Sequence, residues 1–518
     1  MDFKNTMSKI FSYQNNTNYQ YKLSQTQIAN NLNEDLNSDK NKKISTNLKE
    51  NQDYITVKYN ALINSDIVLR NLNINIKGKL YSALLFYIDG MVESDLINNY
   101  VLKALMMKND NNMFSEKESI ITTPPKKIAN ESESQKDSKQ NNNTRYRKAN
   151  NINISDYIYN SLIPQNSLKI TNDFKNLFTA VNAGFTALLV DSLDTAFCIE
   201  AKGFAARSVD KPNNEVVVRG SQEAFVENIR TNTSMLRRLI NNENLVVEQL
   251  SVGNISKTPV CICYMQNITN DDLVNEVRFR ISNLNIDSLL SSDTLDQLIQ
   301  DSSSSPFPQL MSTERPDKAS TSILEGRVVV LVNGTPYALI APAVFVDFLS
   351  SPEDLNQKYQ FANLVKIIRI IAFTVSLFLP GIYVAVTNFH QELIPTDLIF
   401  AIAAGRKAIP FPVIFEILLM ELSFELIREA SLRIPSPMGS TIGIIGGLIL
   451  GEAAVSANIV SPILIIIVAL TGICSFAIPD YSLGFCLRIF RFMYIVLAYI
   501  AGFLGMGLRY LFTTYIFE

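Results

Sequence analysis

The pattern of hydrophobic and polar positions divides this chain of 518 residues into two unequal parts. Polar residues, with Asn, Ser, Asp and Lys prominent, dominate residues 1 to about 365, whereas apolar runs dominate from about 366 to the end. A chain of this length exceeds one ordinary domain. The pattern predicts an N-terminal α+β or α/β region of two small subdomains, followed by an all-α multi-spanning transmembrane domain over residues 364–514.

Within the polar part, stretches with hydrophobic periodicity alternate with stretches that lack it. We expect a disordered polar extension over residues 1–52 and a linker over residues 108–151, because neither stretch can bury enough apolar surface to offset the entropy lost on ordering. The hydrophobic periodicity predicts the first α/β subdomain over residues 53–107 and the second over residues 152–350.

The two predicted subdomains contain similar strand–turn–helix segments. Residues 80–87 align with residues 257–264, and Asp95-Leu96-Ile97-Asn98 then meets Asp272-Leu273-Val274-Asn275 without a gap. The identities are few, so chance similarity is the alternative to a duplicated α/β unit. A duplication would make the two subdomains structurally related.

Local signals predict further elements in the second subdomain. Asn333-Gly334 lies between two apolar runs and indicates a hairpin turn. Ser221 is the expected N-cap of a helix that ends near residue 240. Cys261 and Cys263 alternate on a predicted strand, where we expect them to be small core residues.

The apolar part consists of six segments, in chain order residues 367–389, 394–405, 411–432, 441–458, 462–478 and 488–512. The first contains Pro380-Gly381 near its centre, where a kink is expected. The second, of about 12 residues, is too short for a crossing and predicts a half-helix or a re-entrant segment. The positions of Lys and Arg fit five crossings, or four if the third segment only dips into the bilayer.

The third apolar segment is long enough to cross a membrane and yet contains carboxylates at Glu416, Glu421, Glu425 and Glu429. At 100° per residue, Glu421, Glu425 and Arg428 share one face of a helix, and Glu416 lies nearly opposite. Charges at this depth usually face a bundle interior or a water-filled cavity, which we expect here. The alternative is an amphipathic helix on the membrane surface.

Glycines recur every four residues in the fourth apolar segment. Gly443, Gly447 and Gly451 predict close packing between helices, a packing device rather than a ligand site. Glu452 directly follows this glycine face and is a further candidate for an intramembrane carboxylate.

Composition excludes several classes of function. A formal net charge of −3 without a basic patch argues against a nucleic-acid partner. His390 is the single histidine, and neither a phosphate-binding Gly-rich loop nor a nucleophile motif is present, so we expect no metal, no cofactor and no enzyme activity. The first residues lack the apolar region of a signal peptide, so the N-terminal domain is expected to stay in the cytoplasm.

Motifs that are collinear from about residue 60 to 515 resemble those of the spore germination receptor A-subunit family, the GerA family. In the soluble part they are Arg219-Gly220, Glu223, Phe225-Val226-Glu227-Asn228, Arg230-Thr231-Asn232-Thr233, Ser305-Pro306-Phe307-Pro308-Gln309, Thr313-Glu314-Arg315-Pro316-Asp317, Leu324-Glu325-Gly326-Arg327, Asn333-Gly334-Thr335-Pro336 and Ser351-Pro352-Glu353-Asp354. In the apolar part they are Ile394-Pro395-Thr396-Asp397-Leu398, Ala403-Ala404-Gly405-Arg406, Pro410-Phe411-Pro412, Glu416, Met420-Glu421, Phe424-Glu425 and Arg428-Glu429-Ala430. Ser221-Gln222 departs from the Pro and basic residue common in the family, and Glu452 stands where Gln is common.

The resemblance implies a multi-pass subunit of a spore nutrient-germinant receptor in the inner membrane of a dormant spore. Such a subunit is expected to contact membrane lipid and to work with a B-type transporter-like subunit and a C-type lipoprotein subunit. The resemblance also implies a homo-oligomeric ring whose membrane helices enclose a cation channel.

Two mechanisms are compatible with these features. In the first, the ring conducts cations, and a short segment ended by charges resembles a re-entrant pore element, so the pore or gating candidates are Thr396, Leu398, Ile402 and Ala404. The carboxylates then either attract cations or pair with Arg428 and Arg433 to hold the bundle together. The candidates for coupling the soluble part to the membrane are Arg219, Glu223, Arg230, Glu314, Arg315, Asp317, Asn333 and Gly334. In the second mechanism, the chain is a non-conducting transporter-like or scaffold subunit that relays the germinant signal.

Overall fold

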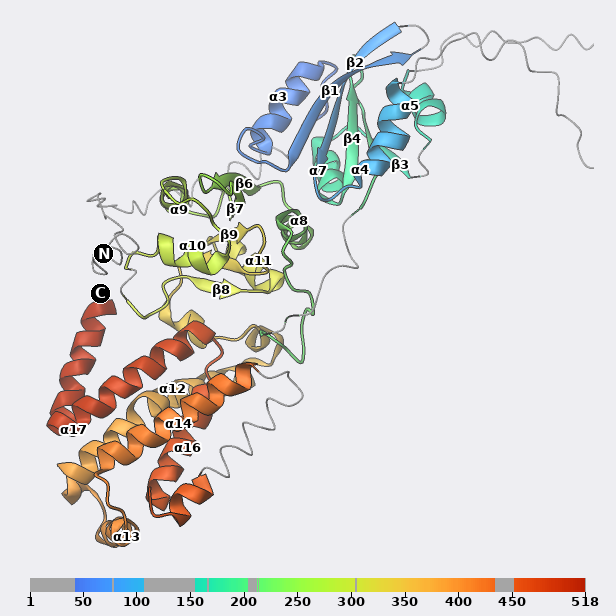
Figure 1. The fold of residues 1–518 in the computed structure, drawn as a ribbon. Coiled ribbons are helices and arrows are strands. Elements are labelled where there is room, and N and C mark those ends of the chain that lie inside the picture. Colours follow the sequence, from blue (N-terminus) through green and yellow to red (C-terminus); the bar gives the residue numbers. More distant parts are fainter. Residues whose placement is uncertain are drawn as a thin grey trace, which may run out of the picture.

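The computed structural model describes residues 42–76, 79–106, 154–164, 167–203, 212, 214–302, 305–433 and 451–517. Figure 1 shows three parts in succession: two α/β domains, each built on one sheet, and a group of long helices at the C-terminal end. The predicted linker 108–151 and most of the predicted fourth apolar segment therefore lie outside the described residues.

The first sheet has five antiparallel strands in the order β1-β2-β4-β5-β3. Its strands are β1 (Ile67–Ile76), β2 (Lys79–Ile88), β3 (Leu168–Thr171), β4 (Phe185–Val190) and β5 (Ala196–Glu200). One face packs against α3 (Leu48–Lys58) and α7 (Phe174–Asn182). The other face packs against α4 (Ser94–Leu96), the π-helix η1 (Ile97–Leu102), α5 (Lys103–Met106), α6 (Ile154–Tyr157) and the π-helix η2 (Ile158–Leu162). Because both faces are covered, β4 is buried along its whole length and reads as a continuous apolar run.

The second sheet repeats this arrangement, with the order β6-β7-β9-β10-β8. Its strands are β6 (Leu245–Val252), β7 (Thr258–Met265), β8 (Met311–Thr313), β9 (Val328–Val332) and β10 (Ala338–Ala341). Helices α8 (Ile229–Leu239) and α11 (Pro316–Leu324) cover one face. Helices α9 (Asp271–Ser282) and α10 (Ser292–Ile299) cover the other.

The two sheets have the same strand order when β1 to β5 are matched with β6 to β10. The aligned segments 80–87 and 257–264 fall on β2 and β7, which hold the same position in their sheets. The matching also includes a helix before the first strand of each unit, α3 and α8. Each unit therefore has the same topology, as a duplication would produce.

The domain boundaries in the structure differ from those predicted from the sequence. Strands β1 and β2, from the predicted first subdomain, share one sheet with β3, β4 and β5, from the predicted second. The expected linker thus falls inside the first domain, because sheet pairing joins strands that lie about 100 residues apart. The expected polar extension also ends too late, since helix α3 begins at Leu48.

The predictions for single turns, caps and core residues have different outcomes. The hairpin around Asn333-Gly334 is confirmed, with β9 and β10 antiparallel and Gly334 at a φ of +93°. Cys261 and Cys263 are buried in the core as expected. The prediction for Ser221 is wrong, because α8 begins at Ile229 and its N-cap is Asn228, whose side chain accepts the N–H groups of Arg230 and Thr231.

The C-terminal part contains the long helices α12 (Tyr359–Asn388), α14 (Val413–Arg433) and α17 (Tyr481–Phe517), and the shorter α13 (Thr396–Arg406) and α16 (Pro462–Phe476). Helix α12 continues through Pro380. Helix α17 is interrupted at Ala501 and Gly502, and the φ of +57° at Gly502 is one that glycine adopts without steric cost. Figure 1 shows α12, α14 and α16 running side by side.

Two of the described helices are long and apolar enough to cross a membrane, Tyr359–Asn388 and Tyr481–Leu511. Helix α16 is apolar but shorter, and α14 contains several charged residues. The four or five crossings expected from the sequence are thus not shown, and two candidate crossings are.

Candidate functional site

The carboxylates of α14 meet arginines of α17 in the interior of the helical part. Arg491 lies 3.3 Å from Glu421 and donates a hydrogen bond of 2.9 Å to Glu425. The side chains of Arg491 and Glu421 are each about 1% exposed. This charged face of the helix is therefore buried between helices.

Glu425 is the centre of the contact, because further arginines reach it. Arg488 donates a hydrogen bond of 3.1 Å to its second oxygen, and Arg428 lies 3.9 Å from its first. Arg428 also donates a hydrogen bond of 2.5 Å to Ser475 of α16 and lies over the ring of Phe476. Three guanidinium groups thus surround two carboxylates and join α14, α16 and α17.

Helical periodicity explains how these groups meet. Glu421, Glu425 and Arg428 are four and three residues apart, so they share one face of α14, as the sequence predicted. Arg488 and Arg491 are three residues apart and share a face of α17 in the same way. The expected pairing with Arg428 is present, whereas the side chain of Arg433 lies outside the described residues.

Glu416 makes a separate contact on the same helix. It is fully buried, and its oxygens accept a hydrogen bond of 3.2 Å from Arg406, at the end of α13, and one of 3.1 Å from the backbone N–H of Ser461. Glu416 therefore ties α13 and the start of α16 to α14.

Helix α13 carries the residues that the sequence proposed for a pore. None of its side chains is buried within this chain, and Leu398 is 47% exposed. Thr396 and Ala404 are also exposed, and Ile402 is partly so. Eleven residues extend about 16 Å, about half of the hydrocarbon thickness of a bilayer.

The other sequence candidates of the helical part are dispersed. Glu452 is exposed. Gly451 is buried, and a Cβ there would lie 3.7 Å from Ile465 of α16, an ordinary packing distance. Gly443 and Gly447 lie outside the described residues.

In the α/β domains, the coupling candidates converge on residues 214–228, which we call the strap because they join the first domain to α8. The Glu314 carboxylate accepts the backbone N–H groups of Asn214 and Glu215, both at 2.6 Å. The fully buried Arg315 donates to the carbonyls of Glu215 and Ser221 at 3.2 and 3.1 Å. Two adjacent residues thus hold the first half of the strap on the second domain.

The second half of the strap is held by the hairpin between β9 and β10. The backbone N–H of Gly334 donates to the carbonyl of Glu227 at 2.8 Å, and Asn333 accepts the N–H of Ile229 at 3.2 Å. Asp317 fixes the guanidinium of Arg315 through hydrogen bonds of 3.1 and 2.6 Å. The motifs around residues 314–317 and 333–334 therefore both hold the strap on the second domain.

The remaining coupling candidates make weaker contacts. Glu223 pairs with Arg238 of α8, and Arg230 lies 3.1 Å from Asp89 of the first domain. Arg219 is exposed on the strap. Ion pairs with this much solvent exposure contribute little to stability.

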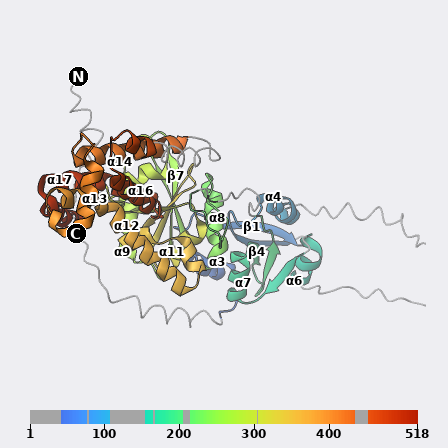
Figure 2. The same ribbon diagram turned by 90° about the horizontal axis from the view of Figure 1, so that it is seen from below.

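A stronger contact between the two α/β domains was not predicted from the sequence. Arg237 of α8 donates two hydrogen bonds of 2.8 Å to Asp66 and one of 2.9 Å to Asn64, and all three side chains are at least 97% buried. Figure 2 shows α8 lying between the two sheets. No local pattern signals this contact, because the partners lie about 170 residues apart.

Side-chain contacts connect the second α/β domain with α12 and α17, including an edge-to-face pair of rings between Phe345 and Phe373 of α12. Arg369 of α12 donates a hydrogen bond of 2.5 Å to Asp354, in the 3₁₀-helix η4 (Pro352–Asn356), and one of 3.3 Å to the carbonyl of Leu349, in η3 (Phe345–Leu349). The ring of Phe307 stacks on Phe490 of α17 at a centroid distance of 4.7 Å. The motif at residues 305–309 thus reaches the helix that carries Arg488 and Arg491.

Carboxylates also face each other at this junction. Burial raises the pKa of Asp296, on α10, to about 6, and the nearby negative charge of Asp480, between α16 and α17, adds to this increase. Burial likewise raises the pKa of Asp480, while Lys318 opposes the increase. Both carboxyl groups are therefore protonated more readily than exposed ones.

Comparison with known proteins identifies the family. The family described as Bacillus/Clostridium GerA spore germination protein matches residues 53–517. The chain belongs to this family. Spore germination protein KA of Bacillus subtilis (strain 168) is 36% identical over 442 residues, which cover 85% of this chain and 74% of that protein. Spore germination protein B1 of the same organism is 41% identical over 343 residues, which cover 66% of this chain and 71% of that protein.

One solved structure is also similar to this GerA-family chain. It is the crystal structure of the N-terminal domain of the A subunit of the Bacillus megaterium spore germinant receptor GerK3, at 29% sequence identity and a TM-score of 0.41. The match covers 59% of this chain and 98% of that chain. A role in spore germination follows from the membership of the family, which is not a known enzyme family.

Proposed function

We propose that this chain is the A-type membrane subunit of a spore nutrient-germinant receptor and forms an oligomeric, nutrient-gated cation channel. In this proposal, the subunits form a homo-oligomeric ring in the spore inner membrane, with the α/β domains in the cytoplasm. A B-type transporter-like subunit and a C-type lipoprotein subunit complete the receptor. The similarity to spore germination proteins KA and B1 of Bacillus subtilis supports the assignment to germination.

The observation that carries the proposal is the continuous set of contacts from the α/β domains to the membrane helices. The Arg237–Asp66 pair holds the first domain to the second. The Arg369–Asp354 pair and the Phe307–Phe490 stack then connect the second domain to α12 and α17. A displacement of the α/β domains would therefore be transmitted to helices in the membrane, as gating from a partner subunit requires.

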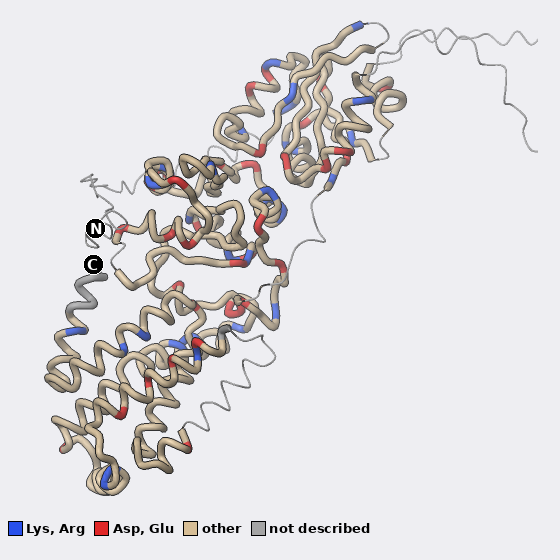
Figure 3. Tube along the Cα trace, in the orientation of Figure 1, with Lys and Arg blue, Asp and Glu red and all other residues tan. Residues whose placement is uncertain are grey.

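The distribution of charge supports the orientation. Figure 3 shows most of the Lys and Arg of the helical part at the end that faces the α/β domains. Positive residues beside membrane helices favour the cytoplasmic side. The same end carries Lys366 and Arg369 of α12 and Arg488 and Arg491 of α17, so the α/β domains are assigned to the cytoplasm.

The buried carboxylates of α14 fit a structural role better than a role in attracting cations. Three arginines surround Glu421 and Glu425, so the cluster carries an excess of positive charge, which would repel a passing cation. We therefore assign this cluster to holding α14, α16 and α17 together. Glu416, paired with Arg406, fixes α13 in the same manner.

The cation path is instead assigned to the surface of α13. This helix is too short to cross a bilayer alone and has no buried side chain within one chain, so neighbouring subunits could complete a pore around it. Thr396, Leu398, Ile402 and Ala404 remain the pore or gating candidates. The alternative function is a non-conducting transporter-like or scaffold subunit that relays the signal through the same contacts.

Recording currents across planar bilayers that contain the purified chain separates the two functions. A channel formed by this chain gives discrete cation currents, with and without its reconstituted B-type and C-type partners. Bilayers that stay tight under every nutrient condition, with protein insertion verified, would contradict channel activity and leave the relay function.

A further inference from the structure

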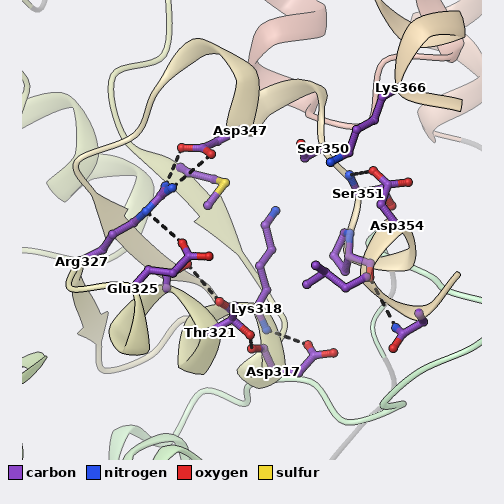
Figure 4. A pocket seen from close by; sticks show the side chains of 15 residues that line it. Asp317, Lys318, Thr321, Glu325, Arg327, Asp347, Ser350, Ser351, Asp354 and Lys366 are labelled. Carbon is purple, nitrogen blue, oxygen red and sulfur yellow. Dashed lines mark hydrogen bonds and ion pairs between the residues drawn. The ribbon is translucent and has the colours of Figure 1, made fainter. Parts of the chain in front are cut away.

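A polar pocket of about 460 Å³ lies where the second α/β domain meets α12. Its walls come from α11, from the 3₁₀-helices η3 and η4, and from Lys366, the eighth residue of α12. Figure 4 shows the Lys366 side chain reaching from one wall toward Ser350 and Ser351, with Asp347 and Glu325 on the opposite side. The volume is within the range of small-molecule and headgroup sites.

Most charged groups of this pocket already have partners of opposite sign. Arg327 donates hydrogen bonds of 2.5 and 3.2 Å to Asp347, and Lys318 donates one of 2.8 Å to Glu215. The Asp354 carboxylate is held by Arg369 at 2.5 Å. These pairs contribute no free charge to a ligand.

Lys366 is available to a ligand, and Glu325 keeps acceptor capacity because Arg327 Nε contacts only one of its oxygens, at 3.4 Å. Lys366 has no ion pair or hydrogen bond with any residue that the structure describes. Asp347 takes the two terminal nitrogens of Arg327, and the Glu325 side chain, which contacts the Nε, is 55% exposed. A ligand that matches both groups carries an acidic group and an ammonium group.

The position of Lys366 along α12 points to a membrane lipid as the source of that ligand. Helix α12 has 30 residues, about 45 Å in length, and it has no charged residue between Ile370 and Asn388. Those 19 residues match the roughly 20 that cross the hydrocarbon of a bilayer. Lys366 therefore lies about 6 Å before the start of the hydrocarbon, at the depth of lipid headgroups.

An apolar surface adjoins the pocket on the membrane side. Ile367, Ile368 and Ile371 are 54%, 50% and 56% exposed and follow Lys366 directly along the helix. Exposed apolar side chains at this depth provide contacts for acyl chains. A soluble zwitterion would leave this surface uncovered.

From these observations, we infer that the pocket binds the headgroup of an aminophospholipid, with its phosphodiester at Lys366 and its primary ammonium at Glu325. The inference rests on the membrane placement proposed above but not on ion conduction. A primary ammonium is required because a quaternary one cannot donate a hydrogen bond to the Glu325 carboxylate.

The test uses the full chain in detergent micelles supplied with dioleoyl phosphatidylethanolamine, phosphatidylcholine or phosphatidylglycerol. Native mass spectrometry measures retained lipid, and thermal unfolding measures stabilisation. The wild type should retain phosphatidylethanolamine about tenfold better than the other two lipids. Lys366→Glu should lose this retention about tenfold, and Lys366→Arg should keep it. Glu325→Gln should bind phosphatidylethanolamine and phosphatidylcholine equally.

Lys358→Glu is the matched control, because Lys358 is an exposed cation just before α12 that does not line the pocket. It should retain lipid as the wild type does, and each variant should unfold at the wild-type temperature without lipid. Equal loss in Lys358→Glu and Lys366→Glu would overturn the inference, as would a preference for phosphatidylglycerol. Stabilisation by free phosphoethanolamine equal to that by the lipid would overturn the lipid source. A chain that fails to associate with vesicles would instead contradict the membrane placement.

Discussion

Arg369, in the first turns of α12, donates a hydrogen bond of 2.5 Å to Asp354, in the 3₁₀-helix that ends the second α/β domain. The side chains are 12% and 5% exposed, so the pair is largely withdrawn from solvent. Charge-assisted hydrogen bonds of this kind are stronger than neutral ones. The contact therefore ties the orientation of α12 to that of the α/β domain.

Replacing Asp354 with Asn should weaken the coupling between nutrient and germination without preventing assembly. The variant keeps the shape of the side chain and removes the charge that holds Arg369. We expect the nutrient concentration for half-maximal germination to rise about 5- to 150-fold, the range of typical coupling energies. Loss of refractility in spores that carry the variant as their only A subunit measures this. Glu353→Gln, which changes the neighbouring carboxylate, should leave the response unchanged, and an equal shift in both variants would contradict the role of the pair.

Replacing Arg237 with Ala should lower the free energy of unfolding by about 3–5 kcal/mol, because the change leaves the buried Asp66 carboxylate without its partner. Arg238→Ala is the matched control, since Arg238 is the next residue of α8 and pairs with the partly exposed Glu223. Arg238→Ala should lower the free energy of unfolding by no more than about 1 kcal/mol. Chemical denaturation of the purified chain measures both values, and similar losses in the two variants would show that the buried pair does not hold the domains.

Glu421→Gln and Glu425→Gln should destabilise the helical part while leaving the ion path unchanged. Each change removes a carboxylate that Arg491 contacts, at a cost of several kcal/mol when a buried ion loses its partner. We expect less assembled protein in detergent but the wild-type unit current and cation selectivity in the channels that do form. A reduced unit current with normal assembly would instead assign the carboxylates to the cation path.

The pKa of about 6 for Asp296 predicts a pH dependence of stability. Burial raises the folded-state pKa of this carboxyl above its unfolded value of about 4, so the folded state binds the extra proton between pH 4 and 6. The contribution of Asp296 to stability is therefore present below pH 4 and falls by on the order of 1–3 kcal/mol as pH rises to 6. Asp296→Asn should remove this component and be more stable than the wild type at pH 7. Thermal unfolding at pH 4.5, 5.5 and 7 measures the difference, and an unchanged pH dependence in Asp296→Asn would contradict this role of Asp296.

The sequence was sufficient to predict single elements, because their signals are local. Strands β2 and β7 are apolar runs bounded by turn residues, and the Asn333-Gly334 hairpin needs only a few residues to define it. The shared face of Glu421 and Glu425 likewise follows from helical periodicity alone.

Partners distant in the sequence were not predictable in the same way. The first sheet joins β2 to β4 across about 100 residues, and neither strand carries a signal of the other. Two of the three arginines around Glu421 and Glu425, Arg488 and Arg491, lie more than 60 residues away, on α17. The role of the carboxylates therefore stayed open in the sequence, because it depends on which helix packs against them.

The most direct test of the proposed ion path is cysteine accessibility along α13 during bilayer recording. Ala404→Cys introduces a thiol on this helix, and Ala453→Cys introduces one at another exposed position of the helical part. A positively charged thiol reagent should reduce the nutrient-evoked cation current of Ala404→Cys at least severalfold and leave that of Ala453→Cys unchanged. An unchanged current in modified Ala404→Cys, with labelling verified, would contradict the assignment of the cation path to α13.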